Sequence, residues 1–324
     1  MKLRVIIAAT LAILAVPAGA AESYPVRPIR IVVTYVPGGN TDNVARLVSP
    51  HLTEHLGQSI VIDNRGGAGG VVGTEIAARA APDGYTLLFG TSAGLSINPQ
   101  LHAKLPYDVD RDFAPISLLV VIPQLMVAYP GLPAKNIGEF LKLARAQPGR
   151  FNYASVGVGS PNHLGMELLK SMTGIDIVHV PYKGSSPAVI DLLAGNVSVF
   201  FSSIPVMLQH VKAGKLKALA VGSAQRSPAA PEIPTVAESG VPGFEYVTWY
   251  GLFLPSRTPR AIVVRLNDAV VKSLRSAQLE QQLRTQGADP RPTTPEEVVA
   301  FMKVERARWE KVVKATGLAD KANP

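Results

Sequence analysis

Residues 29–42 read Ile-Arg-Ile-Val-Val-Thr-Tyr-Val-Pro-Gly-Gly-Asn-Thr-Asp, a β-branched apolar run that meets a glycine turn and then a helix pattern. β-Branched residues favour a strand, and Pro-Gly-Gly is typical of the turn that ends one. We interpret Asp42 as a residue that complements the dipole of the following helix. The stretch therefore predicts a strand, a tight turn and a helix that begins near Thr41.

The same arrangement occurs twice more in the chain. The run 60–63 leads into Arg-Gly-Gly-Ala-Gly-Gly at 65–70, and the run 151–155 leads into Gly-Val-Gly-Ser-Pro at 157–161. Such turns leave backbone N–H groups free beside the positive end of a helix dipole, which suits a carboxylate or another small anion. A single glycine run can be merely a tight turn. Three of them in one chain favour a ligand site.

Strand and helix patterns alternate along most of the chain. The first half predicts strands at 29–36, 59–63 and 85–90, with helices at 41–56 and 70–81. The second half predicts helices at 137–146, 161–172, 187–194 and 205–213, with strands at 151–155, 175–180, 197–202 and 216–221. This alternation is typical of a parallel, doubly wound α/β sheet. Residues 91–115 show only weak periodicity, and residues 223–243 are interpreted as a loop.

Two long apolar runs, Ile116–Tyr129 with Pro123 interrupting it and Val247–Leu254, link the alternating units. A chain of 324 residues is also longer than a single hydrophobic core usually supports. We therefore predict two lobes joined by crossover strands, with the ligand between them. The chain is predicted to end in two helices, one from near Pro259 and one from the capping box Thr294-Pro295-Glu296-Glu297.

Residues 1–20 have the pattern of a secretory signal peptide. Lys2 and Arg4 form a basic start, residues 5–16 an apolar core, and residues 18–20, Ala-Gly-Ala, a cleavage site. The apolar run is too short to span a bilayer. The chain has no cysteine, which excludes a lipid-bearing cysteine, disulfides and thiolate chemistry. We expect a periplasmic protein without a membrane anchor.

The net charge of +8 comes from scattered residues, since only 17% of the chain is charged. No block of Lys and Arg is interleaved with aromatic residues, so nucleic-acid binding is a poor interpretation. A modest positive field attracts anionic solutes, although an ordinary solvated surface explains the charge equally well.

The glycine turns fit neither nucleotide fingerprint. Ala68 takes the first glycine position in one turn and Asn162 the last in another, and the chain has no P-loop. Ser160-Pro161 and Ser186-Pro187 instead predict a capping serine followed by proline at the first helical position.

No catalytic constellation is found. The run 184–188, Gly-Ser-Ser-Pro-Ala, lacks the last glycine of a nucleophile elbow and does not directly follow a predicted strand. His163 and His179 lack metal-ligand spacing. We expect a protein that is not an enzyme and needs no metal or other cofactor. An exported hydrolase remains the competing class.

The chain resembles a known family over essentially its whole mature length: the extracytoplasmic solute receptors called Bug proteins, or TctC-type receptors of tripartite tricarboxylate transporters. The motifs that carry the resemblance are Tyr24-Pro25 through Arg30, Pro37-Gly38-Gly39 with Asp42 and Ala45-Arg46, Asn64 to Gly70, Pro82 to Leu88, Gly159-Ser160 with His163-Leu164 and Glu167, Pro181 to Gly184, and Thr258-Pro259.

The resemblance implies an α/β, two-lobed type II periplasmic-binding-protein fold that closes about a hinge of crossover strands. We expect one lobe at 24–122 plus 250–324 and the other at 123–249. In the family, first-lobe turns and ordered waters hold a carboxylate and the second lobe gives selectivity. Carried onto this chain, the first-lobe candidates are Tyr35, Gly38, Gly39, Thr41, Ala68, Gly69, Thr91 and Ser92, and the second-lobe candidates are Ser160, Asn162, His163, Lys183, Gly184 and Ser203.

The resemblance also implies the partners. The ligand is expected to be a small organic anion, namely a di- or tricarboxylate, an amino acid or an aromatic acid. The protein partner is expected to be the membrane components of a tripartite tricarboxylate transporter or a sensor kinase, and the receptor is expected to be a monomer. A receptor for a neutral or aromatic amide such as nicotinamide remains open.

Overall fold

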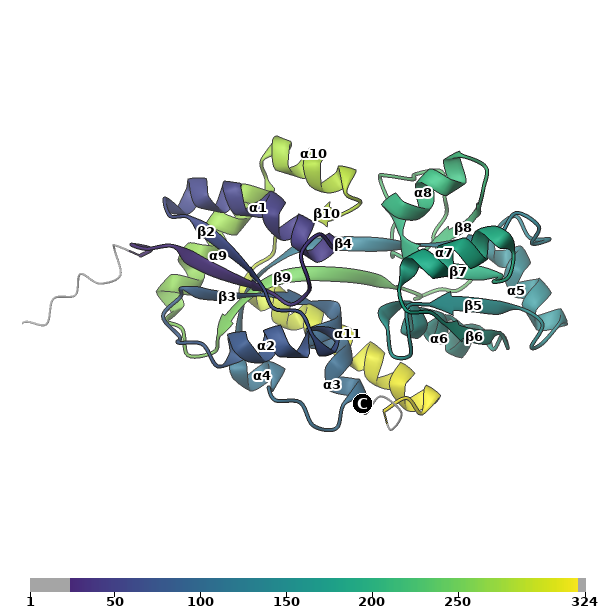
Figure 1. Ribbon diagram of the computed structural model, residues 1–324, viewed down its shortest axis with the longest axis horizontal. Coiled ribbons are helices and arrows are strands. Elements are labelled where there is room, and N and C mark those ends of the chain that lie inside the picture. The colour runs from purple at the N-terminus through teal and green to yellow at the C-terminus, as the bar shows by residue number, and fades with distance from the viewer. Residues whose placement is uncertain (1–23, 320–324) are drawn as a thin grey trace, which may run out of the picture.

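Two sets of parallel strands are joined by two long antiparallel strands in the computed structural model, which describes residues 24–319 (Figure 1). The predicted signal peptide therefore lies outside the described residues. The strand order is β2-β1-β3-β9-β4-β7-β5-β6, and β8 and β10 also pair with β4. The strands are β1 Ile29–Val33, β2 Ile60–Asn64, β3 Thr86–Thr91, β4 Phe113–Ala128, β5 Asn152–Ser155, β6 Val178–Pro181, β7 Val199–Ser203, β8 Lys217–Val221, β9 Val247–Pro255 and β10 Asp289–Pro290.

The two long strands are the crossovers that the apolar runs predicted. Strand β4 pairs with β9 from Phe113 to Pro123 and with β7 from Gln124 to Ala128. The predicted interruption at Pro123 is wrong, because β4 runs through it. Proline has no N–H to donate, and here it lies where the pairing passes from β9 to β7, so the continuous strand accommodates it. The α/β, two-lobed fold class is confirmed.

The helices cover both faces of the sheet in each lobe (Figure 1). They are α1 Asn40–Leu56, α2 Val71–Ala78, α3 Asn98–Leu101, α4 Val109–Asp112, α5 Ile137–Ala146, α6 Pro161–Thr173, α7 Ser185–Ala194, α8 Ile204–Lys212, α9 Arg260–Leu274, α10 Ala277–Thr285 and α11 Pro295–Thr316.

The prediction of only two C-terminal helices is wrong. A separate helix, α10, and the short strand β10 lie between α9 and α11. The break before α10 is a tight turn in which the N–H of Ser276 donates to the carbonyl of Ser273, at 3.1 Å. Neither glycine nor proline occurs there, so the sequence carries no strong stop signal.

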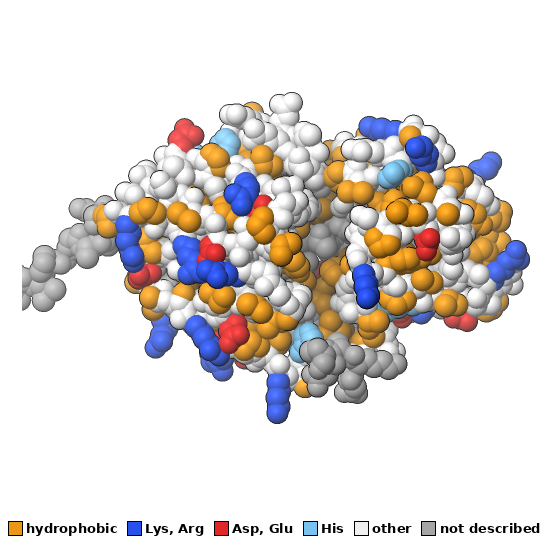
Figure 2. Space-filling model, in the orientation of Figure 1, with side chains coloured by type: hydrophobic (Ala, Val, Ile, Leu, Met, Phe, Trp, Pro, Cys, Tyr) orange, Lys and Arg blue, Asp and Glu red, His pale blue; other side chains and the backbone are white. Residues whose placement is uncertain are grey.

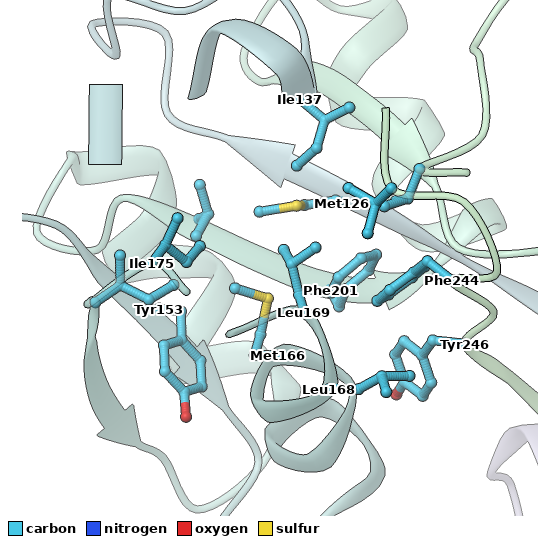
Figure 3. Packing of buried hydrophobic residues seen from close by; sticks show 14 of the residues in the cluster. Met126, Ile137, Tyr153, Met166, Leu168, Leu169, Ile175, Phe201, Phe244 and Tyr246 are labelled. Atoms are coloured by element: carbon cyan, nitrogen blue, oxygen red, sulfur yellow. The ribbon is translucent and has the colours of Figure 1, made fainter. Parts of the chain in front are cut away.

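Each lobe has an apolar core on both faces of its part of the sheet. In the second lobe, one cluster packs α5 and α6 against the sheet through residues such as Ile137, Leu169 and Phe201 (Figure 3). Helix α11 contributes to both lobes, since Met302 packs in a first-lobe cluster and Trp309 in that second-lobe cluster. The lobe boundaries at 122/123 and 249/250 stay a prediction.

Candidate functional site

The turn after β1 is fixed by a buried carboxylate. Asp42, 2% exposed, accepts the backbone N–H of Gly38 at 2.9 Å and the Arg46 guanidinium at 2.9 Å. Its other oxygen accepts the Asn64 amide at 3.0 Å. The hydrogen bond from Arg46, together with those from Gly38 and Asn64, lowers the pKa of Asp42 to about 2. Asp42 lies in the first turn of α1, as predicted, and it also holds the glycine turn in place.

Gly39 is the N-cap of α1 and has an ordinary φ of −81°. The backbone N–H groups at the start of a helix have no partner within the helix, so they are available to a ligand. Two residues on, the Thr41 hydroxyl donates to the Tyr250 hydroxyl on β9 at 3.2 Å, which ties this turn to a crossover strand. Gly39 itself is exposed.

The second glycine turn needs unusual backbone angles. Gly67, Gly69 and Gly70 have φ values of 139°, 62° and 95°, and Ala68 has a φ of 45°. Left-handed angles of this kind favour glycine, which explains the composition of 66–70. The carbonyl of Gly69 accepts hydrogen bonds from the Tyr35 hydroxyl at 3.3 Å and the Asn98 amide at 3.2 Å.

Tyr35 stays a neutral donor at this turn, because burial raises the pKa of its phenol. Of the other first-lobe candidates, Thr91 ends β3 and Ser92 follows it, and both are 3% exposed. The Thr91 hydroxyl accepts the N–H of Gly94 at 3.2 Å. These side chains therefore shape the first-lobe wall from beneath its surface.

The third glycine turn, in the second lobe, is held by a hydrogen bond between two of its own residues. The Ser160 hydroxyl donates to the carbonyl of Gly157 at 2.6 Å, and Ser160 is the N-cap of α6, as predicted. Asn162 donates its amide to the carbonyl of Phe201 at 2.6 Å, so its side chain links α6 to β7. Ser203 is the N-cap of α8.

The start of α7 differs from the prediction. The helix begins at Ser185 with Gly184 as its N-cap, so Ser186-Pro187 lies inside the first turn and the predicted Ser186 cap is wrong. Gly184 has a φ of 117°, which explains why glycine rather than serine occupies the cap. Lys183 is exposed just after β6.

A cavity of about 760 Å³ joins the first-lobe turns to the second-lobe loop. Figure 2 shows a groove between the two lobes from one face of the molecule. Of the predicted site residues, the structure places Tyr35, Ala68, Gly69 and Ser160 in the cavity wall. Those outside this wall are Gly38, Gly39, Thr41, Thr91, Ser92, Asn162, His163, Lys183, Gly184 and Ser203.

Much of the first-lobe wall comes from a segment for which the sequence predicted no element. Asn98, His102 and Lys104 line the cavity, together with Leu101 and Leu105. The segment folds as a π-helical turn, Ala93–Ile97, followed by the single turn of α3. Such short elements have no amphipathic period, which is why the sequence pattern missed them. Asp and Glu are absent from the wall, whereas Lys104 and His102 are present, so the wall suits an anion.

Ser155 and His179 form a contact that the sequence did not predict. The Ser155 hydroxyl lies 2.6 Å from Nε2 of His179. A nucleophile must reach its substrate, yet Ser155 has no exposed surface. This pair therefore gives no support to the hydrolase alternative.

Two features are absent from residues 24–319. No cluster of three or more His, Asp or Glu side chains is arranged there to hold a metal ion. Among the helices of the same residues, none combines the length and apolar character needed to cross a bilayer.

Two lobes, crossover strands and an anion-compatible cavity between the lobes define a solute-binding receptor. Residues 44–318 match the profile of the TctC family, described as "Tripartite tricarboxylate transporter family receptor". The chain belongs to this family, and the predicted Bug or TctC resemblance is confirmed.

Relatives are similar over nearly the full length. The chain is 40% identical to Protein BugT of Bordetella pertussis over 298 residues, which cover 92% of this chain and 91% of BugT. It is 39% identical to "UPF0065 protein in tcbD-tcbE intergenic region" of Pseudomonas sp. strain P51 over 293 residues, 90% of this chain and 87% of that protein.

Solved structures of similar proteins include two with carboxylates. "R. palustris Rpa4515 with adipate" has a TM-score of 0.78 at 38% identity, covering 91% of this chain and 99% of that one. MatC from Rhodopseudomonas palustris with bound malate has a TM-score of 0.74 at 36% identity, covering 90% and 100%. A ligand-free TctC solute-binding protein from Polaromonas has a TM-score of 0.81 at 29% identity, covering 90% and 100%.

Proposed function

We propose that this protein is a periplasmic receptor that captures a small carboxylate between its lobes, for a tripartite tricarboxylate transporter or for a signalling system. The observation that carries the proposal is the cavity between the lobes. It is bounded by the first-lobe glycine turn and the second-lobe loop, and it contains Lys104 but no acidic side chain. Adipate and malate in similar proteins support the same class of ligand.

The arrangement binds without performing chemistry. The first-lobe turns offer backbone N–H groups, which are donors suited to a carboxylate, whereas the Tyr35 hydroxyl donates its proton to the Gly69 carbonyl. The apolar residues Leu101, Leu105 and Val158 line the same cavity and would contact the carbon skeleton of the solute. A receptor of this kind releases its ligand unchanged, so we propose that the protein is not an enzyme.

We further propose that the lobes, 24–122 plus 250–324 and 123–249, close about β4 and β9 when the solute binds. Closure would bring Lys183, which is exposed, and Gly184, which is half-buried, toward the ligand.

A thermal-shift screen of organic acids tests the ligand class. Each acid is paired with its amide, for example nicotinate with nicotinamide, and hits are measured by calorimetry. We expect the acid of a pair to bind and the amide to bind far more weakly. Preference for the amide would replace the carboxylate proposal with the amide receptor, and ligand turnover seen by mass spectrometry would replace it with the hydrolase.

A further inference from the structure

The second-lobe wall of the cavity rests on two stacked histidines, His163, which is buried, and His179, which is half-buried. The N–H of Gly159 donates to Nδ1 of His163 at 3.0 Å. His163 is 5% exposed and lies outside the cavity wall, whereas Gly159 lies in it. The histidine therefore contacts the back of the loop 156–160, whose front faces the cavity.

The neighbouring histidine holds the same loop at a second point. Nε2 of His179 lies 2.6 Å from the Ser155 hydroxyl, and that hydroxyl accepts the N–H of Gly157 at 3.1 Å. Gly157 and Gly159 have φ values of 131° and 75°, which are left-handed angles that favour glycine. Glycine allows a loop many backbone conformations. The hydrogen bonds of Gly157 with Ser155 and of Gly159 with His163 therefore restrict this loop.

The two imidazoles are packed face to face. Their ring centroids are 3.9 Å apart with 12° between the planes, and the Tyr153 ring stacks on His179 at 4.9 Å. The Tyr153 hydroxyl points away from the labelled apolar cluster (Figure 3) and donates to Glu167 at 2.5 Å. Glu167 also accepts Nζ of Lys170 at 2.7 Å. The stack of three rings is therefore linked, through the Tyr153 hydroxyl, to the Glu167–Lys170 ion pair of α6.

The contact with Gly159 requires an uncharged ring. Nδ1 accepts a hydrogen bond only in the neutral imidazole, because both ring nitrogens carry protons in the charged form. Burial, aided by His179 and Lys170 and opposed by Glu167, lowers the pKa of His163 to about 4. Burial also lowers the pKa of His179. Both rings are therefore neutral at neutral pH.

We propose that His163, backed by His179, is a positioning residue that fixes the loop 156–160 in its ligand-binding shape through Nδ1 and the Gly159 N–H. The inference rests on the proposed function, since the loop matters for affinity only if the adjoining cavity binds a solute. A loop that is ordered before binding loses less conformational freedom when the ligand arrives, so affinity depends on this contact. His163 then acts on the ligand through the loop rather than by touching it.

Two substitutions separate the acceptor from the packing. His163→Asn keeps an uncharged acceptor close to the position of Nδ1, and His163→Phe keeps a flat ring but no acceptor. His51→Asn on α1 is the matched control. With adipate as the probe at pH 7, we expect calorimetry to give Kd values within about threefold of wild type for His163→Asn and His51→Asn, and about tenfold weaker for His163→Phe.

A second readout needs no ligand. The protection factor of the Gly159 amide against hydrogen exchange, followed by NMR, reports the hydrogen bond directly. We expect protection at pH 7 in wild type and His163→Asn but not in His163→Phe. As the pH falls toward about 4, wild type should lose this protection and His163→Asn should keep it. The wild-type pH series involves no substitution, so a variant that fails to fold leaves the test intact.

The outcomes separate the two proposals. If wild type does not bind adipate or any acid of the screen, the proposed function fails, while the Gly159 measurement still decides the inference. Full protection of Gly159 in His163→Phe, or equal loss of affinity in both His163 variants, would overturn the positioning role.

Discussion

The indole N–H of Trp249, on the crossover strand β9, donates to the buried carboxylate of Glu305, on α11, at 3.3 Å. The same carboxylate accepts the indole N–H of Trp309 at 3.2 Å and the Arg308 guanidinium at 2.9 Å. The Arg308 guanidinium also donates to the Glu245 carboxylate at 2.7 Å. Because α11 packs in the cores of both lobes, this network lies where the lobes are joined.

Glu305 should make stability depend on pH. Burial raises the pKa of Glu305 above 4.5, although Arg308 opposes the shift. The folded protein then binds more protons than the unfolded chain, so the free energy of unfolding falls as pH rises from 4.5 through the folded-state pKa. Glu305→Gln should lack this dependence. Urea unfolding of both proteins at several pH values checks it, and parallel pH profiles would contradict it.

Removing the carboxylate altogether should be more damaging. Glu305→Ala leaves two buried indole N–H groups without their acceptor and leaves Arg308 with Glu245 alone, so we expect a loss of about 2–4 kcal/mol of unfolding free energy. Glu310→Ala, on the same helix with a half-exposed side chain, is the matched control and should change stability by less than about 0.5 kcal/mol. Equal effects of the two substitutions would show that the network stabilises nothing.

Asp42 should couple the first-lobe turn to both stability and binding. Its pKa is lowered from 3.8 to about 2, so its stabilising contribution is complete above pH 3.8 and is lost as pH falls toward 2. Asp42→Asn, with weaker bonds to Gly38 and Arg46, should lose about 1–3 kcal/mol at pH 7 and weaken carboxylate binding. Urea unfolding and calorimetry measure the two effects. Unchanged affinity in a measurably destabilised variant would show that the turn held by Asp42 does not contribute to ligand binding.

Lys104 should strengthen the binding of ligands that carry a second negative charge. It lines the cavity, so Lys104→Gln should weaken adipate about three- to tenfold but leave hexanoate, which has one carboxylate, nearly unaffected. Lys142→Gln, on the exposed side of α5, is the control. Calorimetry at low and high salt gives the comparison. Equal losses of affinity for both acids would mean that Lys104 attracts anions in general and does not contact the second carboxylate.

Closure of the lobes should be visible in solution. Small-angle scattering of the protein should show a smaller radius of gyration when a saturating carboxylate is added, because closure brings the lobes together about β4 and β9. The radius should stay constant with the non-binding amide of the same acid. A constant radius with the bound acid as well would count against a hinged receptor.

Sequence alone predicted the elements that end in strong local signals. The capping box at Thr294 is present with Glu297, and the apolar β-branched runs became β4 and β9. It did not predict α10, whose start has neither glycine nor proline and whose single local signal is the N-cap Ser276. A single serine without a stop residue before it is too weak a signal to predict a helix boundary.

The candidate site was predicted in the same uneven way. The glycine turns were found because left-handed backbone angles demand glycine, and Ala68 and Gly69 do line the cavity. Lys104 and His102 were missed because they follow a π-helical turn and a single helical turn without periodicity. The contact of His163 with Gly159 joins the start of a helix to the loop before it, and no residue pattern distinguishes that contact from a direct contact with the ligand.

The central claim is that first-lobe backbone N–H groups anchor a carboxylate, and Gly39→Val tests it most directly. Gly69 is a poor test site because its φ of 62° strains any side chain. Gly39 has a φ of −81°, and an added Cβ meets nothing closer than the Val36 carbonyl at 3.8 Å. The variant should therefore fold normally while its side chain covers the N–H groups at the start of α1. Gly39 lies outside the cavity wall, so the variant tests the proposal that these N–H groups also reach the ligand. Gly138→Val on α5 is the control.

The measurement is calorimetric titration of both variants with the acid that wild type binds. Losing two charge-assisted hydrogen bonds should weaken binding by about two to four powers of ten in Gly39→Val. Gly138→Val should bind as wild type does. Wild-type affinity in a folded Gly39→Val protein would contradict the account, because the carboxylate would then be held by groups other than the first-lobe turn.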